Sequence, residues 1–259
     1  MPFLSRFYRA ACALVVASGL FMAAAPATAQ VNPAQRGEIE SIIKDYLMKN
    51  PEVLRDALIE LERRGKAEEA DKRTRAVKEL APQIFNSKYQ VVLGNPKGKI
   101  ELVEFFDFNC GYCRRAMTDL ITLMKDNPDL RVVLKEFPVL GPRSVEAAQV
   151  ALAFILQQPA QKYWEFHQRL MLAKGQIGKD QAFAAAKASG ADMARLEKDM
   201  NGDEVRAALT EIMGMADALS LTGTPAYIVG DEIVVGAVGA AQLQAKISNF
   251  RKCGKGSCD

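Results

Sequence analysis

The sequence lacks a strong excess of either charge, and it contains a single histidine and a single tryptophan. Its 34 basic and 31 acidic residues give a formal charge of +3 over 259 residues. This balance offers no electrostatic basis for binding nucleic acid or anionic membranes. Beyond the N-terminal segment, no stretch has the ~18 uninterrupted apolar residues that a membrane-spanning helix needs. The composition therefore argues against a nucleic-acid-binding protein and against internal membrane spans.

Residues 1–29 have the three parts of a secretory signal peptide. Arg6 and Arg9 make a basic start, residues 10–25 are apolar, and an Ala-Thr-Ala sequence ends at Ala29. Cleavage there removes two arginines and no acidic residue, so the remaining 230 residues carry a formal charge of +1. We expect a soluble periplasmic protein that is long enough for one domain with an appendage.

Residues 30–80 are expected to form a helical oligomerisation arm and a charged linker. Apolar residues recur at helical spacing, and Asn50-Pro51 divides them between two helices because proline disrupts a helix interior. The stripe consists of Ile39, Ile42, Ile43, Tyr46, Leu47, Val53, Leu54, Leu58 and Leu61. The mixed-charge segment after it predicts a solvated helix or a flexible link interrupted at Gly65. The stripe needs its own domain or a second copy as a partner, and we expect self-association.

The main domain, residues 81–259, begins with a parallel crossover unit. Apolar runs at 90–94, 100–106 and 131–137 predict strands, and a helix is expected from Cys110 to about Asp126. A strand, a helix and a strand in this order form a parallel crossover.

Residues 144–219 predict four or five helices, because proline, glycine and asparagine interrupt a sequence rich in Ala, Leu, Gln and Glu. Strands at 225–230 and 232–236 and a helix over 242–250 follow. The expected fold class is α/β, a small mixed sheet with helices on its faces.

Four cysteines remain after signal cleavage, namely Cys110, Cys113, Cys253 and Cys258. Two residues separate the first pair, a spacing found in zinc sites, haem attachment sites, structural disulfides and reactive dithiols. Zinc would need a second ligand pair with the usual spacing, and neither the C-terminal cysteines nor His167 provides one. Haem attachment would need a histidine directly after the second cysteine, where the chain has Arg114. A structural disulfide and a reactive dithiol stay open.

The position of the first pair favours a reactive dithiol. Cys110 follows an apolar strand and opens a helix, so free backbone N–H groups and the positive end of the helix dipole stabilise its thiolate. A lowered pKa supplies a nucleophile at neutral pH and makes Cys110 a good leaving group. We predict that Cys110 is the exposed attacking cysteine and that Cys113, one turn inside the helix, is the shielded resolving cysteine.

The sequence VEFFDFNCGYC, together with the distant TGTPAYIVG, resembles the DsbA-like branch of the thioredoxin superfamily. The resemblance covers residues 81–250 and implies a thioredoxin fold with a helical insertion at about 142–202. It also implies that Pro225 is the cis-proline that meets the substrate strand, and that Thr224 tunes redox behaviour and substrate release. The alternative for Thr224 is an ordinary residue at the start of a strand.

Glu104, six residues before Cys110, matches a buried acid of DsbA-like proteins. Desolvation raises the pKa of a carboxyl group in a core strand, which lets it relay the proton of the resolving thiol. The alternative for Glu104 is an ion pair with a nearby lysine. His167 lies in the helical insertion and is expected to be an ordinary helix residue.

Gly111 and Tyr112, with Thr224 before the proline, resemble disulfide isomerases more than oxidases. The arm resembles the N-terminal region of ScsC-like (suppressor of copper sensitivity) proteins, where such helices mediate oligomerisation. The resemblance implies a homo-oligomer, with a trimer favoured, that acts on unfolded or misfolded cysteine-containing exported proteins. A membrane thiol reductase would be its electron donor. The alternative enzyme is a monomeric dithiol oxidase.

Two further expectations concern the cysteines. A protein that holds copper(I) between Cys110 and Cys113 is the alternative of another class, because soft thiolates suit that ion. Cys253 and Cys258 close a short glycine-rich loop at the C-terminus and are expected to form a structural disulfide. No cofactor is expected.

Overall fold

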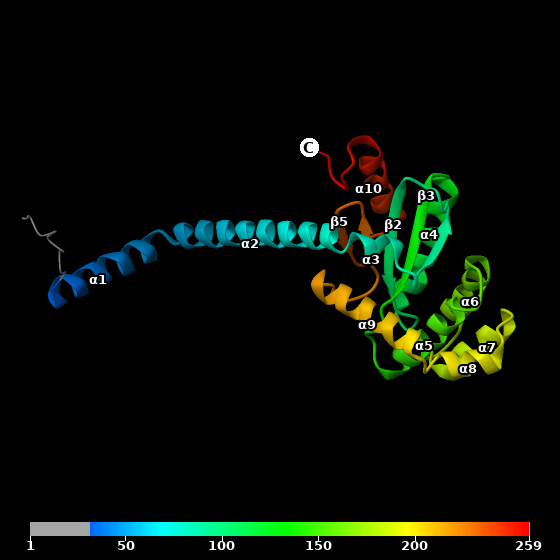
Figure 1. Cartoon of the computed structure of the whole chain (residues 1–259). Coiled ribbons are helices and arrows are strands. Elements are labelled where there is room, and N and C mark those ends of the chain that lie inside the picture. Colours follow the sequence, from blue (N-terminus) through cyan, green and yellow to red (C-terminus); the bar gives the residue numbers. More distant parts are fainter. Residues whose placement is uncertain (1–31, 259) are drawn as a thin grey trace, which may run out of the picture. The chain divides into compact units, whose positions relative to one another are not determined.

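The computed structural model describes residues 32–258. The expected signal peptide lies outside the described residues. The chain divides into two compact units, one that ends at Glu62 and one that begins at Arg63 (Figure 1).

The arm consists of α1 (Pro33–Lys49) and α2 (Pro51–Glu79). The two helices are separated at Asn50-Pro51, as predicted, because proline is tolerated at the first position of a helix and not inside one. The charged segment is helical, and the predicted interruption at Gly65 is wrong because α2 continues through it. A single glycine costs a helix only about 1 kcal/mol, and the Ala, Glu, Lys and Arg residues around it favour the helix.

The apolar stripe of the arm is exposed to solvent in the single chain. Val53 is 38% exposed and Tyr46 55%, whereas Leu47 is half-buried. The other residues of the stripe are exposed, namely Ile39, Ile42, Ile43, Leu54, Leu58 and Leu61, and Met48 and Ile59 of the same helices are exposed as well. Burying apolar surface is worth about 25 cal/mol per Å², so this face has free energy to gain from a partner.

The second unit is built on a five-stranded sheet of order β1-β3-β2-β4-β5. The strands are β1 (Val91–Gly94), β2 (Ile100–Phe106), β3 (Leu130–Glu136), β4 (Ala226–Val229) and β5 (Glu232–Val235). β2 and β3 are parallel and are joined by α4 (Gly111–Asp126), the predicted crossover, whereas the other neighbours are antiparallel. This mixed sheet is that of a thioredoxin fold and confirms the predicted fold class.

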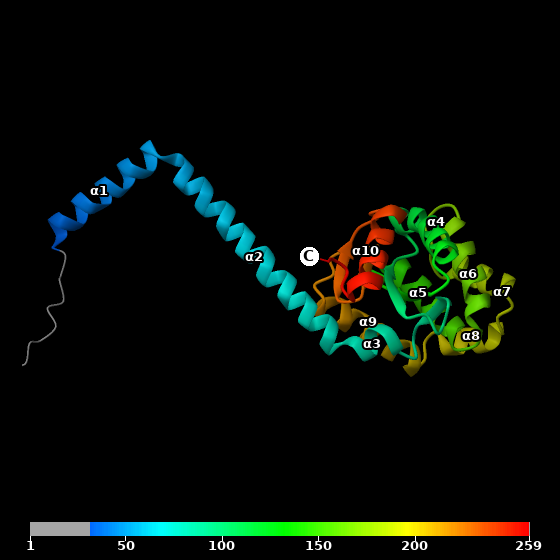
Figure 2. The same cartoon turned by 90° about the horizontal axis from the view of Figure 1, so that it is seen from above.

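Helices cover both faces of the sheet (Figure 2). α4 and α10 (Ala240–Cys253) pack on each other and on one face. α3 (Ala81–Asn86), α5 (Pro142–Ile155) and α9 (Asp203–Ala218) contact β2 or β3 from the other face. The remaining helices are α6 (Ala160–Leu172), α7 (Lys179–Ala188) and α8 (Met193–Asp199). Five helices, α5 to α9, thus occupy the long stretch for which four or five were predicted.

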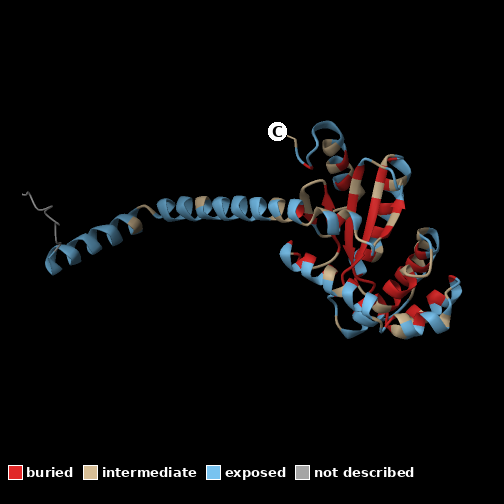
Figure 3. Cartoon of the chain, viewed as in Figure 1, coloured by how far each residue is buried: buried red, intermediate tan, exposed pale blue. Residues whose placement is uncertain are grey.

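The core lies in the three central strands and on the inner sides of the helices around them (Figure 3). Leu102, Val103 and Phe105 of β2 have no exposed surface. The turn before Cys110 therefore follows directly on a strand that is buried in the core. Within residues 32–258, no helix combines the length and the apolar character that crossing a bilayer requires.

Candidate active site

Cys110 occupies the N-cap of α4, and Cys113 lies one turn inside the helix. β2 ends just before this turn, which closes when the N–H of Cys110 donates to the carbonyl oxygen of Asp107 at 3.0 Å. The Cys110 sulfur accepts the N–H of Cys113 at 3.4 Å, the position in which a serine or aspartate oxygen caps many helices. Both thiols are free. As predicted, the Cys110 sulfur lies at the start of the helix, where the first backbone N–H groups have no partner within the helix.

Thr224 and Pro225 reach the cysteine pair from a distant part of the chain. The peptide bond between them is cis. The Cys110 thiol donates to the Thr224 carbonyl oxygen at 3.2 Å across a separation of 114 residues. The Thr224 hydroxyl is buried and has no hydrogen-bond partner in this state. The fold therefore brings the Thr-Pro pair onto the sulfur that the sequence predicts to attack.

The prediction that Cys110 is exposed is wrong. Its exposed fraction is 5%, against 1% for Cys113. The Thr224-Pro225 loop lies against the Cys110 sulfur and covers it, a contact that local sequence does not reveal. Tyr112, between the two cysteines, is 59% exposed and is the accessible side chain of this turn.

The two thiols have opposite electrostatic environments. The pKa of Cys110 is lowered from 9.0 to about 5. The largest cause is the hydrogen bond from the Cys113 thiol. The Thr224 side chain, which can donate to the thiolate, and the backbone N–H groups of Cys113 and Tyr112 lower it further. Burial raises the pKa of Cys113 far above its usual value, and its hydrogen bond to Cys110 and the charge of Glu104 act in the same direction. At pH 7 the pair is therefore a Cys110 thiolate beside a Cys113 thiol.

Glu104 lies in the core of β2 with an exposed fraction of 2%. Burial raises its pKa from 4.5 to about 8, the Tyr227 hydroxyl opposes this shift, and the charge of Cys110 adds to it. The Tyr227 hydroxyl donates to Oε1 of Glu104 at 3.5 Å. No lysine contributes to the environment of Glu104 among the described residues, so the ion-pair alternative is wrong. A carboxyl group that titrates near neutral pH beside a thiol that must ionise suits proton transfer.

Two groups of buried or half-buried polar residues at the ends of β2 and β3 were not predicted. Glu136 ends β3 in the core and accepts a hydrogen bond from the Tyr163 hydroxyl. Its signal in the sequence is an acidic residue inside an apolar strand, the same pattern that identifies Glu104. Asp107 and Asn109 lie between β2 and Cys110, and their side chains bond to segments far along the chain. No local pattern indicates those partners.

His167 is buried in an aromatic cluster. Its ring packs edge-on against Phe106, with ring centroids 4.7 Å apart, and stacks on Trp164 at 5.2 Å. Burial lowers its pKa to about 3, so the imidazole is neutral at physiological pH. It is a core residue of the helical insertion, in agreement with the expectation that it is an ordinary helix residue.

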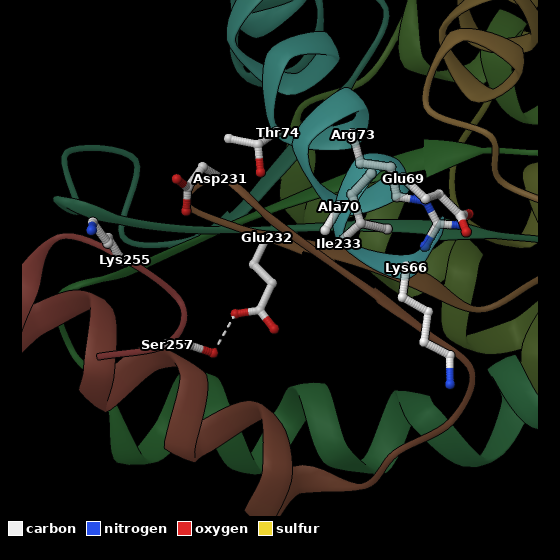
Figure 4. A pocket seen from close by; sticks show the side chains of 10 residues that line it. All are labelled: Lys66, Glu69, Ala70, Arg73, Thr74, Asp231, Glu232, Ile233, Lys255 and Ser257. Carbon is white, nitrogen blue, oxygen red and sulfur yellow. Dashed lines mark hydrogen bonds and ion pairs between the residues drawn. The ribbon is translucent and has the colours of Figure 1, made fainter. Parts of the chain in front are cut away.

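Cys253 and Cys258 are joined by a disulfide that closes the C-terminal loop after α10. This loop helps to line a cavity of about 440 Å³ (Figure 4). The lining residues are Lys66, Glu69, Ala70, Arg73, Thr74, Asp231, Glu232, Ile233, Lys255 and Ser257. None of them is a predicted catalytic residue. In the described part of the chain, no three His, Cys, Asp or Glu side chains gather as a metal site would require.

Two family models match the chain in separate segments. Residues 101–248 match the DSBA-like thioredoxin domain, and residues 35–68 match the N-terminal domain of the copper resistance protein ScsC. A thioredoxin-like oxidoreductase from Silicibacter pomeroyi DSS-3 is 40% identical, with 66% of this chain and 98% of that chain covered at a TM-score of 0.63. A linker-deletion mutant of Proteus mirabilis ScsC is 27% identical over 87% of this chain and 99% of that chain, with a TM-score of 0.64.

The curated relatives include longer proteins. The chain spans about a quarter of the length of the Na(+)/H(+) antiporter NhaA 1 of Mycolicibacterium gilvum, at 28% identity over 158 residues, and the match covers 59% of this chain and 25% of the antiporter. The thiol:disulfide interchange protein DsbA of Bordetella pertussis is 26% identical over 146 residues, 54% of this chain and 68% of that protein. The segment that matches the DSBA-like model contains Glu104, both cysteines of the dithiol and the cis-proline. The chain therefore belongs to the DSBA-like thioredoxin-domain family of thiol-disulfide oxidoreductases.

Proposed function

We propose that the chain is a periplasmic thiol-disulfide isomerase or reductase that works as a homo-oligomer, with Cys110 and Cys113 as its reactive pair. The observation that carries the exchange chemistry is the Cys110 sulfur at the N-cap of α4, where it accepts the Cys113 N–H and its pKa is lowered, while the pKa of the buried Cys113 is raised. That asymmetry supports exchange in either direction. The exposed apolar stripe of the arm is what favours an isomerase over a monomeric oxidase.

The proposed cycle begins when the Cys110 thiolate attacks one sulfur of a client disulfide. A Cys110–client bond forms, the client S–S bond breaks, and the other client sulfur leaves as a thiolate. In isomerisation, a different client thiolate attacks the mixed disulfide, so a new client disulfide forms and Cys110 returns as a thiolate without net electron transfer. The clients are unfolded or misfolded exported proteins that contain cysteine.

In reduction, Cys113 completes the reaction. Its thiol loses a proton and attacks the Cys110 sulfur, so the Cys110–Cys113 disulfide forms and the client leaves with two reduced sulfurs. Glu104 is proposed to accept that proton in its carboxylate form, because its charge acts on the Cys113 thiol and its pKa of about 8 leaves a fraction of the group ionised at neutral pH. A membrane thiol reductase would then return two electrons to the pair.

Thr224 and Pro225 are proposed to present backbone to the client. The Thr224 carbonyl oxygen is 3.2 Å from the Cys110 sulfur, so a client strand at this loop would bring its own sulfur to the attacking atom. The unpartnered Thr224 hydroxyl is available to the thiolate, which as an anion no longer donates to the carbonyl oxygen.

The arm is proposed to join copies of the chain, with a trimer favoured. Support comes from its exposed apolar side chains and from its match to the ScsC N-terminal domain over residues 35–68. An oligomer presents several dithiols to one misfolded client, which raises the effective concentration for repeated exchange.

A second candidate is copper(I) binding at the same dithiol. The matched arm model carries the name of a copper resistance protein, and thiolates suit copper(I). Stoichiometric retention of copper(I) against a competing chelator by the wild-type protein, lost in Cys110→Ser, would support this candidate.

The direction of exchange is tested with one client protein that has several disulfides. We expect the wild-type protein to restore activity to the scrambled client faster than it oxidises the same client from its reduced form. Cys110→Ser should abolish both activities. Oxidation without unscrambling would reverse the choice in favour of the oxidase.

A further inference from the structure

The side chain of Asp107 is a buried hydrogen-bond centre next to the dithiol. Its exposed fraction is 2%. Oδ1 accepts the N–H of Asn109 and the hydroxyl of Ser144, each at 2.8 Å. Oδ2 accepts the N–H groups of Val139 and Leu140 at 2.9 and 3.0 Å. Four donors therefore surround this carboxylate, and they come from the Cys110 turn, the loop after β3 and the start of α5.

The backbone of the same residue acts on both cysteines. The carbonyl oxygen of Asp107 accepts the N–H of Cys110 at 3.0 Å. The Asp107 backbone also opposes the rise in the pKa of Cys113. Any movement of Asp107 therefore changes the position of Cys110.

Asn109 ties the residue directly before Cys110 to the helical insertion. Its Oδ1 accepts the N–H of Ile177 at 2.7 Å, and its Nδ2 donates to the carbonyl oxygen of the same residue at 2.8 Å. Nδ2 also donates to the Ser144 hydroxyl at 3.0 Å. Ile177 lies between α6 and α7 and has no exposed surface, so this anchor is itself held in the core.

We propose that Asp107 and Asn109 are positioning residues that hold the Cys110 turn against the helical insertion and thereby keep the Cys110 thiolate aligned with its hydrogen-bond donors. The inference rests on the proposed thiol chemistry of Cys110. The nitrogen of Cys113 lies 3.4 Å from the Cys110 sulfur, within hydrogen-bonding distance of sulfur, and this bond depends on the position of the turn. Hydrogen bonds weaken steeply as distance and angle depart from their optimum, so a small shift of the turn removes much of this stabilisation.

The test compares Asn109→Ala with Asn127→Ala in the full chain. Asn127 is buried at the other end of α4, where its Nδ2 donates to Leu123 O at 2.9 Å and to Gln244 Oε1 at 2.6 Å. The two variants thus lose similar hydrogen bonds from the two ends of one helix. The rate of iodoacetamide alkylation at Cys110 is measured against pH, with the modified peptide identified by mass spectrometry, and the melting temperature of each variant is recorded.

Both variants should melt at a lower temperature, but only Asn109→Ala should raise the pKa of Cys110. The expected rise is about one unit, which lowers the alkylation rate about tenfold at a pH below the wild-type pKa. An unchanged Cys110 pKa in Asn109→Ala, with a lowered melting temperature, would show a structural role alone and overturn the inference.

Ser144→Ala keeps the inference testable if Asn109→Ala does not fold. This variant removes the hydroxyl that Asp107 and Asn109 share, and it should raise the Cys110 pKa in the same direction by a smaller amount; no rise would overturn the inference. If the proposed thiol chemistry itself is wrong, the wild-type protein would show no reactive Cys110 thiolate at neutral pH. That outcome differs from a reactive wild-type thiolate whose pKa is unchanged in the variants.

Discussion

Replacement of Glu104 by glutamine should stabilise the reduced protein at neutral pH. Burial raises the pKa of this carboxyl group from 4.5 to about 8. The pKa of this group is higher in the folded than in the unfolded protein, so the unfolded chain ionises first as pH rises. The free energy of unfolding of the wild type therefore falls as pH rises from 4.5 to 8. Glutamine has nearly the same size, still accepts the Tyr227 hydroxyl and never ionises. At pH 7 the variant should be more stable by about 3 kcal/mol.

Urea unfolding of both reduced proteins between pH 4.5 and 8 measures this difference. The free energies of unfolding of wild type and Glu104→Gln should be most similar near pH 4.5. Between pH 4.5 and 8 they should diverge by about 1.4 kcal/mol for each pH unit. Glu101→Gln is the matched control, because Glu101 lies on the same strand but is half-buried and paired with Arg131 at 2.6 Å. A difference between wild type and Glu104→Gln that stays constant over this range would refute the reasoning. Unchanged resolution of a Cys110–client mixed disulfide by Cys113 in Glu104→Gln would refute its proton-transfer role.

Three further predictions concern the dithiol, the arm and the core. Reduced wild-type protein should be alkylated at Cys110 with an apparent pKa near 5 and hardly at Cys113, as peptide mass spectrometry would measure. Ile42→Asp should lower the mass in light scattering to that of one chain, with Lys44→Asp as the control, and an oligomer in both variants would contradict the role of the stripe. Tyr163→Phe leaves the buried Glu136 carboxyl without its donor, so urea unfolding should show a loss of about 1–3 kcal/mol; no loss would contradict this.

The secondary structure was largely predictable, because it follows from patterns within a few residues. Apolar runs and their flanking turn residues locate β2 and β3, and helical spacing with Asn50-Pro51 locates both arm helices. The exception at Gly65 has a local cause, since a lone glycine is too weak to end a helix whose other residues favour it. The same local reasoning places Cys110 at the start of α4.

The surroundings of the dithiol were not predictable in this way, because they come from segments far apart in the chain. Thr224 covers the Cys110 sulfur from 114 residues away, Tyr227 meets Glu104 across 123, and Ile177 holds Asn109 across 68. The sequence by itself determined a cysteine pair at a helix N-terminus, since that depends on neighbouring residues alone. Only the tertiary structure decided that Cys110 is covered, that Tyr227 meets Glu104 in the core, and that the Cys110 turn is held by the insertion. Burial and hydrogen-bond partners set these properties, and both arise when distant segments pack together.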